Sequence, residues 1–580
     1  MPRRYLLLPT ILVGCWLAAG ARAETITVGS FAAGCDFSTL SAAVSRAAST
    51  SGSDSILLTV DATWIGGSPL QLTNESSVTF QGITSCGDFT AIRRTITTTA
   101  GDLFLFDGTS VTFRNLDLVG DTAGRLVVAR NASIITLRET TLRGGQSASA
   151  VDDGGNVSIT DGASLVALSG SEIVGGQALN GGGVYCEASG NSTIALGAGS
   201  RVADNLAVNS GGGIYADECT VSVFSGGPST AGRLGVFGNH SDGSGGGIYA
   251  ESSSVIVGGT ASFPGSIRGN TSAGAGGGLY LRESSAEITD SEVVGNLSGS
   301  DGGGFYLALY STLTMHRTLA SCGRGFRCSL LAGNRAGFGS ATGLGGAVHI
   351  SGNSDAEVLQ TYVTDNAAAS DAGQVAYLSD VDTDLLIEGS VLFDNAETGI
   401  QISSFGHTRL AFVSAWGSSE PGSSMAFAEV LGFGRLDFYS SLIVEGRGNS
   451  PLGGSTDPIL LPPGPDSTFE VNCSFLHEDA STGSTFPVFT DPATLWPFAE
   501  EGNPGVNPGA LAVDYCNTAV YAPVDDDIDG EPRGLDISIG NILGPYDLGA
   551  DESDGSFPVS EEIFSDGFES GNVSAWSSSI

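Results

Sequence analysis

The sequence predicts an all-β solenoid on three observations: a recurring glycine motif, short alternating strands between its copies, and almost no stretches of helical period. The motif consists of three glycines, an aliphatic or aromatic residue and a tyrosine. Its copies are 181–185, 211–215, 245–249, 276–280 and 302–306, with altered copies at 345–349 and 373–377. The third glycines of the five full copies are 30, 34, 31 and 26 residues apart. Repeats of this length are typical of stacked units that share one continuous core.

The strands between the glycine motifs alternate apolar and polar residues, so each buries one face. They include 77–80, 110–113, 133–137, 156–159 and 254–257. Two or three strands in about 30 residues favour a single-stranded right-handed parallel β-helix over a propeller, whose four-stranded blades are longer. We expect about 15 coils, spaced about 4.8 Å apart.

Each part of the motif has a predicted place in the coil. The glycines form a corner where the backbones of successive coils approach closely. The aliphatic residue points inward. The tyrosine after it either points outward, as a stripe suited to glycan stacking, or packs along the corner. In four copies an asparagine stands six residues before the first glycine and predicts a ladder of side-chain amides: Asn205, Asn239, Asn270 and Asn296.

Both ends of a solenoid need caps, because an open end would expose unpaired strands. Residues 24–54 are the predicted N-terminal cap, with a strand at 25–28 and a short helix capped by Ser38. The helix would bury Leu40, Ala43, Val44 and Ala47. The repeats occupy 55–450, with an insertion at 307–343. Proline-rich terminal coils and an irregular C-terminal cap follow at 451–552, and then an acidic tail, predicted to be disordered, at 553–580.

The N-terminus predicts export. Two arginines precede an apolar stretch at 5–20, and small residues before Glu24 form a cleavage site after Ala23. An alternative is a lipobox at 12–15, which would lipidate Cys15; the apolar stretch before it is short, so cleavage after Ala23 is favoured. No later stretch is apolar and long enough to span a membrane. We therefore expect a secreted or cell-surface protein without a transmembrane segment.

Cysteine usage agrees with an oxidising compartment. Cleavage after Ala23 leaves eight of the nine cysteines, an even number. The sequence does not determine how they pair. Proximity along the chain suggests four disulfides: Cys35–Cys86, Cys186–Cys219, Cys322–Cys328 and Cys473–Cys516.

The charge of the chain excludes some partners. The formal net charge is −40, and all 23 basic residues are arginine. Such a surface repels nucleic acid and anionic membranes. Without a lysine, and without the motifs that accompany catalytic carboxylates in polygalacturonase-like enzymes, the sequence assigns no catalytic residue.

The asparagine and glycine motif resembles bacterial right-handed parallel β-helix proteins of the pectin-lyase-like superfold. Residues 345–348 resemble the GGAI repeats of polymorphic outer-membrane proteins, although the companion FxxN motif of that family is absent. The segments 527–533 and 546–552 are similar to the ending of many exported β-helix repeat proteins. The resemblance implies the fold, but the superfold hosts lyases, hydrolases, adhesins and inert rods, so it does not choose a function.

Two candidate sites lie where the repetition breaks. In the insertion, a basic island formed by Arg317, Arg324, Phe326 and Arg327 could grip an acidic sugar or a protein carboxylate; alternatively, the arginines pair with acidic neighbours on the rod. Near the C-terminus, the spacing of four aspartates matches a calcium loop, and the alternative is an acidic turn. These aspartates are Asp525, Asp527, Asp529 and Asp536.

We expect a monomeric extracellular or cell-surface rod that binds glycans or surface partners. The alternatives are a polysaccharide lyase or glycoside hydrolase on the same fold, and a purely structural matrix protein. Three or more carboxylates with an arginine in one groove would favour the enzyme. An ordered tyrosine stripe would favour glycan binding, and a featureless acidic surface would favour the structural protein.

Overall fold

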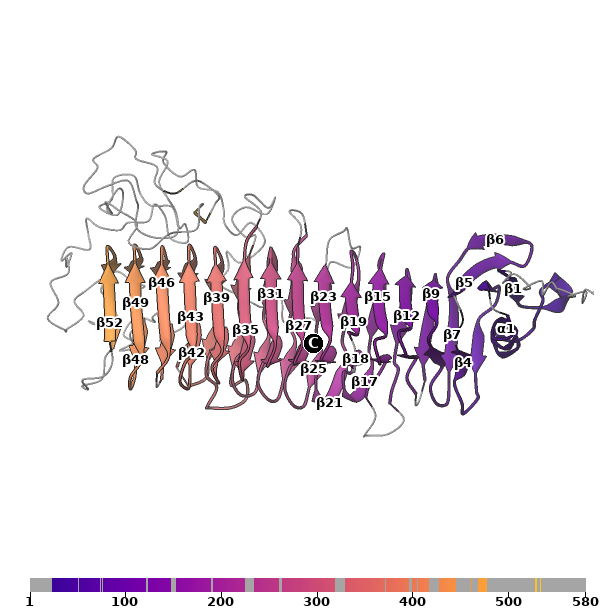
Figure 1. The fold of residues 1–580 in the computed structure, drawn as a ribbon, viewed down its shortest axis with the longest axis horizontal. Coiled ribbons are helices and arrows are strands. Elements are labelled where there is room, and N and C mark those ends of the chain that lie inside the picture. The colour runs from indigo at the N-terminus through magenta and orange to yellow at the C-terminus, as the bar shows by residue number, and fades with distance from the viewer. Residues whose placement is uncertain are drawn as a thin grey trace, which may run out of the picture.

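The computed structural model shows one elongated rod, in which strands of successive coils lie side by side and the N-terminal cap closes one end (Figure 1). It describes residues 23–444, 459–460, 468–476, 527–528 and 533. Gaps fall at 51, 74, 76, 122–123, 148–152, 189–190, 225–233, 260–262, 319–328, 371, 396–398, 404 and 417–426. The predicted tail at 553–580 and most of the predicted C-terminal cap lie outside the described residues.

The rod is a parallel β-helix, as the sequence predicted, and its strands form four sheets where two or three strands in each repeat were expected. Among the named strands, only the hairpin β5–β6 pairs antiparallel. We call the 17-, 15- and 14-stranded sheets A, B and C; the fourth has seven strands. Each coil contributes one strand to each of sheets A, B and C in turn, and the middle coils add a short strand to the seven-stranded sheet between B and C.

The strand bounds follow the coils. Sheet A contains β1 (Thr25–Val28), β2 (Ser53–Leu58), β5 (Ser77–Ser85), β6 (Asp88–Ala91), β9 (Ser110–Arg114), β12 (Ile134–Arg138), β15 (Ser164–Leu168), β19 (Thr193–Leu196), β23 (Thr220–Phe224), β27 (Ser254–Gly258), β31 (Ser285–Thr289), β35 (Thr312–His316), β39 (Asp355–Leu359), β43 (Asp384–Glu388), β46 (His407–Ala411), β49 (Arg435–Tyr439) and β52 (Thr468–Asn472). Sheet B contains β3 (Ala62–Trp64), β7 (Arg94–Thr98), β10 (Leu116–Gly120), β13 (Thr141–Arg143), β16 (Glu172–Val174), β20 (Arg201–Ala203), β24 (Gly235–Phe237), β28 (Gly265–Arg268), β32 (Ser291–Val294), β36 (Leu330–Ala332), β40 (Tyr362–Thr364), β44 (Val391–Phe393), β47 (Ser414–Trp416), β50 (Leu442–Val444) and β53 (Phe475–Leu476). Sheet C contains β4 (Leu70–Thr73), β8 (Phe104–Asp107), β11 (Val127–Arg130), β14 (Val157–Thr160), β18 (Val184–Glu187), β22 (Ile214–Asp217), β26 (Ile248–Glu251), β30 (Leu279–Arg282), β34 (Phe305–Ala308), β38 (Val348–Ile350), β42 (Ala376–Leu378), β45 (Ile400–Ile402), β48 (Ala428–Val430) and β51 (Ile459–Leu460). The seven-stranded sheet contains β17 (Gln177–Asn180), β21 (Leu206–Ser210), β25 (His240–Ser241), β29 (Thr271–Ser272), β33 (Leu297–Ser298), β37 (Arg335–Ala336) and β41 (Ala367–Ala368).

The asparagine ladder is confirmed and runs along the interior of the rod. The Nδ2 of Asn205 donates to the Oδ1 of Asn239 at 2.9 Å, and Asn239 donates to Asn270 in the same way at 3.0 Å. The pattern continues coil by coil through Asn296 to Asn395, and each member is at most 1% exposed. Each side chain therefore satisfies polar groups that would otherwise be buried without partners.

The glycine corner is confirmed as well. Gly211 has a φ of +68°, a left-handed conformation that suits glycine. A Cβ on Gly212 would lie 2.4 Å from the carbonyl oxygen of Gly246 in the next coil. The residue that follows each glycine triplet points inward, as predicted. Val184, Ile214, Ile248, Leu279 and Phe305 are all fully buried.

The N-terminal cap consists of β1, a 3-10 helix (Phe31–Ala33) and the helix α1 (Leu40–Ala47). The four predicted core residues of α1 are buried. The N-cap residue is Thr39 and not Ser38, because the Thr39 hydroxyl reaches the amide of Ala42 at 3.4 Å. In the described residues no helix has the length and apolar character needed to cross a membrane.

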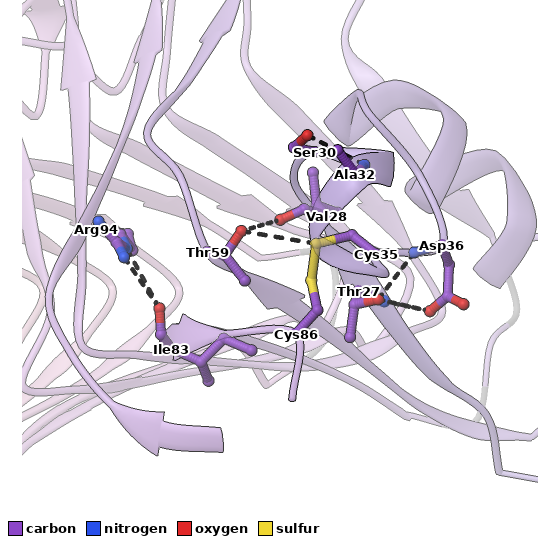
Figure 2. Close-up of a disulfide and its surroundings, with 10 residues drawn as sticks. All are labelled: Thr27, Val28, Ser30, Ala32, Cys35, Asp36, Thr59, Ile83, Cys86 and Arg94. Atoms are coloured by element: carbon purple, nitrogen blue, oxygen red, sulfur yellow. Dashed lines mark hydrogen bonds between the residues drawn. A yellow bond between two sulfur atoms is a disulfide. The ribbon is translucent and has the colours of Figure 1, made fainter. Parts of the chain in front are cut away.

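Two of the suggested disulfides are confirmed. Figure 2 shows Cys35 bonded to Cys86, which ties the cap to the first coils beside Thr59. The second joins Cys186 and Cys219 in neighbouring coils. Cys473 is also disulfide-bonded; its suggested partner Cys516, and the suggested pair Cys322–Cys328, lie outside the described residues. Two disulfides are compatible with an extracellular protein.

Candidate functional site

A stack of tyrosines runs along the outer face of sheet C. In-register pairing of β18, β22, β26, β30 and β34 places one tyrosine beside the next. The four ring pairs have centroids 4.9 to 5.2 Å apart and planes within 12° of parallel. We call this set the tyrosine stack: Tyr185, Tyr215, Tyr249, Tyr280 and Tyr306. His349 continues it at 4.7 Å, and Tyr377 follows at 5.2 Å.

The stack settles which way the motif tyrosines point, because they lie on the outer face. Their ring faces, however, cover one another, so the interior members present ring edges and hydroxyl groups to solvent. A sugar that packs its C–H groups on a ring needs a free face. The tyrosine stack therefore contributes hydrogen-bonding groups and stability, and a free ring face for glycan stacking must come from elsewhere.

Burial keeps the hydroxyl groups of the tyrosine stack protonated. It is the main cause of a raised pKa in all five tyrosines. At Tyr215 neighbouring carboxylates add to the effect, and the pKa is raised to about 12. His349 is only 4% exposed, and burial lowers its pKa to about 4. The tyrosine hydroxyls are consequently donors, and the imidazole is neutral, at physiological pH.

A row of carboxylates lies beside the stack, two residues after each of its first three tyrosines. Glu187, Asp217 and Glu251 are aligned across β18, β22 and β26, and Arg282 continues the row on β30. The Tyr185 hydroxyl donates to Glu187 at 2.9 Å, and an Nη of Arg282 lies 3.4 Å from Glu251. We call Glu187, Asp217 and Glu251 the carboxylate row. Burial raises the pKa of Asp217, and the neighbouring carboxylates Glu251, Glu218 and Glu187 add to that shift.

An open, shallow cavity of about 430 Å³ adjoins the carboxylate row, over the turn from sheet C to sheet A. Its rim includes Glu218, Ser252 and Glu283, each the next residue after a member of the row or after Arg282. Tyr310 also lines it and is 70% exposed, so its ring face is free. We call this the turn cavity.

The backbone at Tyr310 lies in the left-handed region, with φ values of 49° at Leu309 and 60° at Tyr310. The same two-residue pattern occurs at an earlier turn from sheet C to sheet A, at Asn131 and Ala132. A non-glycine residue with a positive φ costs about 1–2 kcal/mol. The conformation is therefore a property of this type of turn and does not by itself mark a functional site.

The predicted basic island is only partly described. Arg317 is 8% exposed, and its guanidinium donates to the backbone carbonyls of Asp527, at 2.7 Å, and Ile528. It is therefore occupied by the C-terminal segment and not turned to solvent. Arg324, Phe326 and Arg327 lie outside the described residues, so their part of the hypothesis stays a prediction.

Three of the four predicted calcium residues lie outside the described part of the chain: Asp525, Asp529 and Asp536. Asp527 is buried, and its backbone carbonyl also accepts from Gln360 at 3.0 Å. Among described residues, no three His, Cys, Asp or Glu side chains are arranged to hold a metal ion. Arg317 of the predicted basic island thus contacts Asp527 of the predicted calcium loop.

The sequence reasoning missed the carboxylate row and the turn cavity. A signal for the row was present: the second residue after the tyrosine is acidic in three successive copies, Glu187, Asp217 and Glu251. Tyr310 had no comparable signal, because it follows the repeat strand by only a few residues and belongs to no motif.

The comparisons with known proteins assign no family to the chain. No protein-family model matches it, and no curated protein matches it. Among solved structures it is similar to pectate lyase Pel9A, with 10% identity over 92% of this chain and 96% of that chain, at a TM-score of 0.19. The parallel strand pairings, and not this similarity, establish the fold. The resemblance to GGAI-type repeats stays a prediction.

Proposed function

We propose that this chain is an exported rod that binds glycans at the turn cavity. The observation that carries this proposal is the exposed ring of Tyr310 at a cavity that glutamate and serine residues also line. A sugar presents an apolar C–H face and a ring of hydroxyl groups. Tyr310 supplies the matching apolar surface, and Glu218, Ser252 and Glu283 supply hydrogen-bonding groups.

The charge around the cavity favours neutral or amino-bearing glycans over uronic acid polymers. Glu218 and Glu283 lie on the rim, and the carboxylate row adjoins it. The chain as a whole carries a formal charge of −40. An acidic polysaccharide would meet like charge at the site and along the rod, whereas an amino sugar would meet opposite charge.

The test is a glycan array with the chain lacking residues 1–23, followed by titration of each hit with two variants. Tyr310→Ala removes the free ring and should weaken binding at least tenfold, because the apolar contact is lost. Phe31→Ala is the matched control, since Phe31 is 65% exposed at the far end of the rod. Equal affinities for Tyr310→Ala and the unmodified chain would rule out the turn cavity as the binding site.

A second candidate function is cleavage of a polysaccharide by the carboxylate row. Hydrolysis of a glycosidic bond uses one protonated and one ionised carboxyl group. The raised pKa of Asp217 between Glu187 and Glu251 gives the row one group that tends toward the protonated form. Reducing-sugar and unsaturated-product assays on neutral, amino-bearing and acidic polysaccharides test this, with Asp217→Asn as the variant. Turnover that survives this substitution would place catalysis elsewhere.

Calcium binding by Asp525, Asp527, Asp529 and Asp536 remains part of the proposal, supported by their spacing alone. A bound ion would stabilise the folded chain by an amount that rises with the logarithm of its concentration once that exceeds the dissociation constant. The melting temperature should therefore rise from chelator to millimolar Ca²⁺. An unchanged melting temperature would count against the site.

A further inference from the structure

The first strand of the rod begins beside the predicted cleavage site. The backbone N–H of Glu24, the residue before β1, donates to the Oδ1 of Asp54 at 2.8 Å. The carbonyl of Glu24 accepts from the amide of Ser55 at 2.8 Å, so the backbone of Glu24 is fixed on both sides. Asp54 lies in β2 and is 2% exposed, whereas Ala23 is exposed.

The carboxylate of Asp54 is buried with neutral partners. Besides the Glu24 amide, it accepts from the hydroxyl of Thr50. A second buried acid lies within electrostatic range: Glu75 is 7% exposed, and its Oε2 has no hydrogen-bond partner among described residues. Burial raises the pKa of Glu75, and Asp54 raises it further. A buried carboxylate without a paired cation is costly, and among the described residues no ion pair reaches Asp54, although the charge of Arg46 acts on it from a distance.

The side chain of Arg46 does not fill that role, because it forms an outer ion pair. Its Nε and Nη2 donate to the carboxylate of Glu24 at 2.7 and 2.8 Å, and the two side chains are 47% and 36% exposed. This contact holds Glu24 from the solvent side. The backbone nitrogen of Glu24 remains directed at Asp54 from within.

We propose that cleavage after Ala23 creates an α-ammonium group on Glu24 that forms a buried ion pair with Asp54 and completes the N-terminal cap. The step is a hydrolysis by a peptidase of the signal-peptide-cleaving class. Water breaks the Ala23–Glu24 peptide bond; its hydroxyl joins the Ala23 carbonyl carbon, and the Glu24 nitrogen takes up protons to become the ammonium. Before cleavage the same nitrogen donates one neutral hydrogen bond; afterwards it carries a full charge and three protons.

The inference rests on the predicted cleavage and not on what the rod binds. It gives processing a consequence for the fold, because the mature chain closes its cap more firmly than the precursor. The two other groups that face the site are Glu75 and the Arg46–Glu24 pair. Both are present in the two forms, so cleavage creates neither of them, and Arg46 also acts on Asp54 through its charge.

The experiment compares two forms of the chain, one beginning at Glu24 and one beginning at Ala23. An amino group beside a carboxylate has a raised pKa, above about 8 for a free terminus, so its contribution is complete below that value and is lost as the pH rises through the raised value. The Glu24 form should melt a few degrees higher than the Ala23 form at pH 6.5, and the difference should vanish above pH 10. In the Ala23 form the nitrogen of Glu24 is an amide and does not titrate.

Two variants separate the ion pair from its surroundings. Asp54→Asn should abolish the difference between the two forms at pH 6.5. Arg46→Gln is the matched control, because it removes an ion pair on the same residue and should lower both forms equally. Melting curves of the two forms that coincide at every pH would overturn the proposal, even if Asp54→Asn fails to fold. Mass spectrometry of the exported chain should find Glu24 as its first residue, and another first residue would equally overturn it.

Discussion

Replacing Asn239 by alanine tests the asparagine ladder. Asn239 is 1% exposed, and its Oδ1 accepts from the backbone amide of Asn205 at 3.1 Å and from its Nδ2 at 2.9 Å. Its own Nδ2 donates to the carbonyl of Val202 and to Asn270, both at 3.0 Å. The alanine variant removes all four hydrogen bonds and leaves two buried donors of Asn205 without this acceptor.

The magnitude follows from those two donors. A buried polar group left without a partner costs about 1–3 kcal/mol, so the local loss should be about 2–6 kcal/mol. Asn209→Ala is the matched control: Asn209 is exposed, and its side chain donates only to Asn180 at 2.9 Å within the described part of the chain. Its loss should stay below about 1 kcal/mol.

Hydrogen exchange is the suitable assay, because a long repeat protein need not unfold in one step. In Asn239→Ala, peptides that contain Asn205 should exchange at least about 30-fold faster, since each 1.4 kcal/mol is a factor of ten. Peptides from the N-terminal cap should be unchanged. If Asn239→Ala and Asn209→Ala exchange alike, the ladder is not a major source of stability and the reasoning fails.

Three further predictions concern the outer face and the cross-link. Tyr249→Ala should lower stability by about 3–5 kcal/mol by opening the tyrosine stack. Tyr249→Phe removes only the hydroxyl, which donates to Glu251 at 3.3 Å and accepts from Arg282, and should cost about 1–2 kcal/mol; urea unfolding compares the two variants. Because the folded pKa of His349 is about 4 and its unfolded pKa is about 6.5, the unfolded chain binds the proton first as the pH falls, so about 3 kcal/mol should be lost between pH 6.5 and 4. His349→Tyr should remove that part of the acid sensitivity, and identical pH profiles would contradict the assignment. Replacing Cys186 and Cys219 together by alanine should cost about 3 kcal/mol, and a melting temperature equal to that of the unmodified chain would refute a stabilising cross-link.

The repetitive part of the fold was predictable because its signals are local. The inward position after each glycine triplet and the asparagine at a fixed offset both follow from one coil repeated many times, and Asn205 and Ile214 are placed as expected. The helix cap was misplaced by one residue, from Thr39 to Ser38, because both residue types cap helices and only the backbone decides which hydroxyl reaches the free amide.

The candidate site was less predictable, because it depends on how coils of unequal length align. Tyr215 and Tyr249 are 34 residues apart, whereas Tyr249 and Tyr280 are 31 apart, yet both pairs lie in register. Only that register covers the ring faces and aligns Asp217 with Glu251. Arg317 was expected either to bind a ligand or to pair with an acidic neighbour, and it does neither within the described residues, because its guanidinium donates to a backbone carbonyl 210 residues away.

The sequence alone determined that this chain is a parallel β-helix with an amide ladder inside and a capped N-terminus, because periodicity, turn residues and cap residues act within one coil. The tertiary structure decided what the outer surface offers, namely ring edges along the tyrosine stack and a free ring at Tyr310. It also decided that the buried Asp54 faces the nitrogen of Glu24. The physical reason is that surface chemistry depends on which side chains of different coils become neighbours, and that is set by register and not by composition.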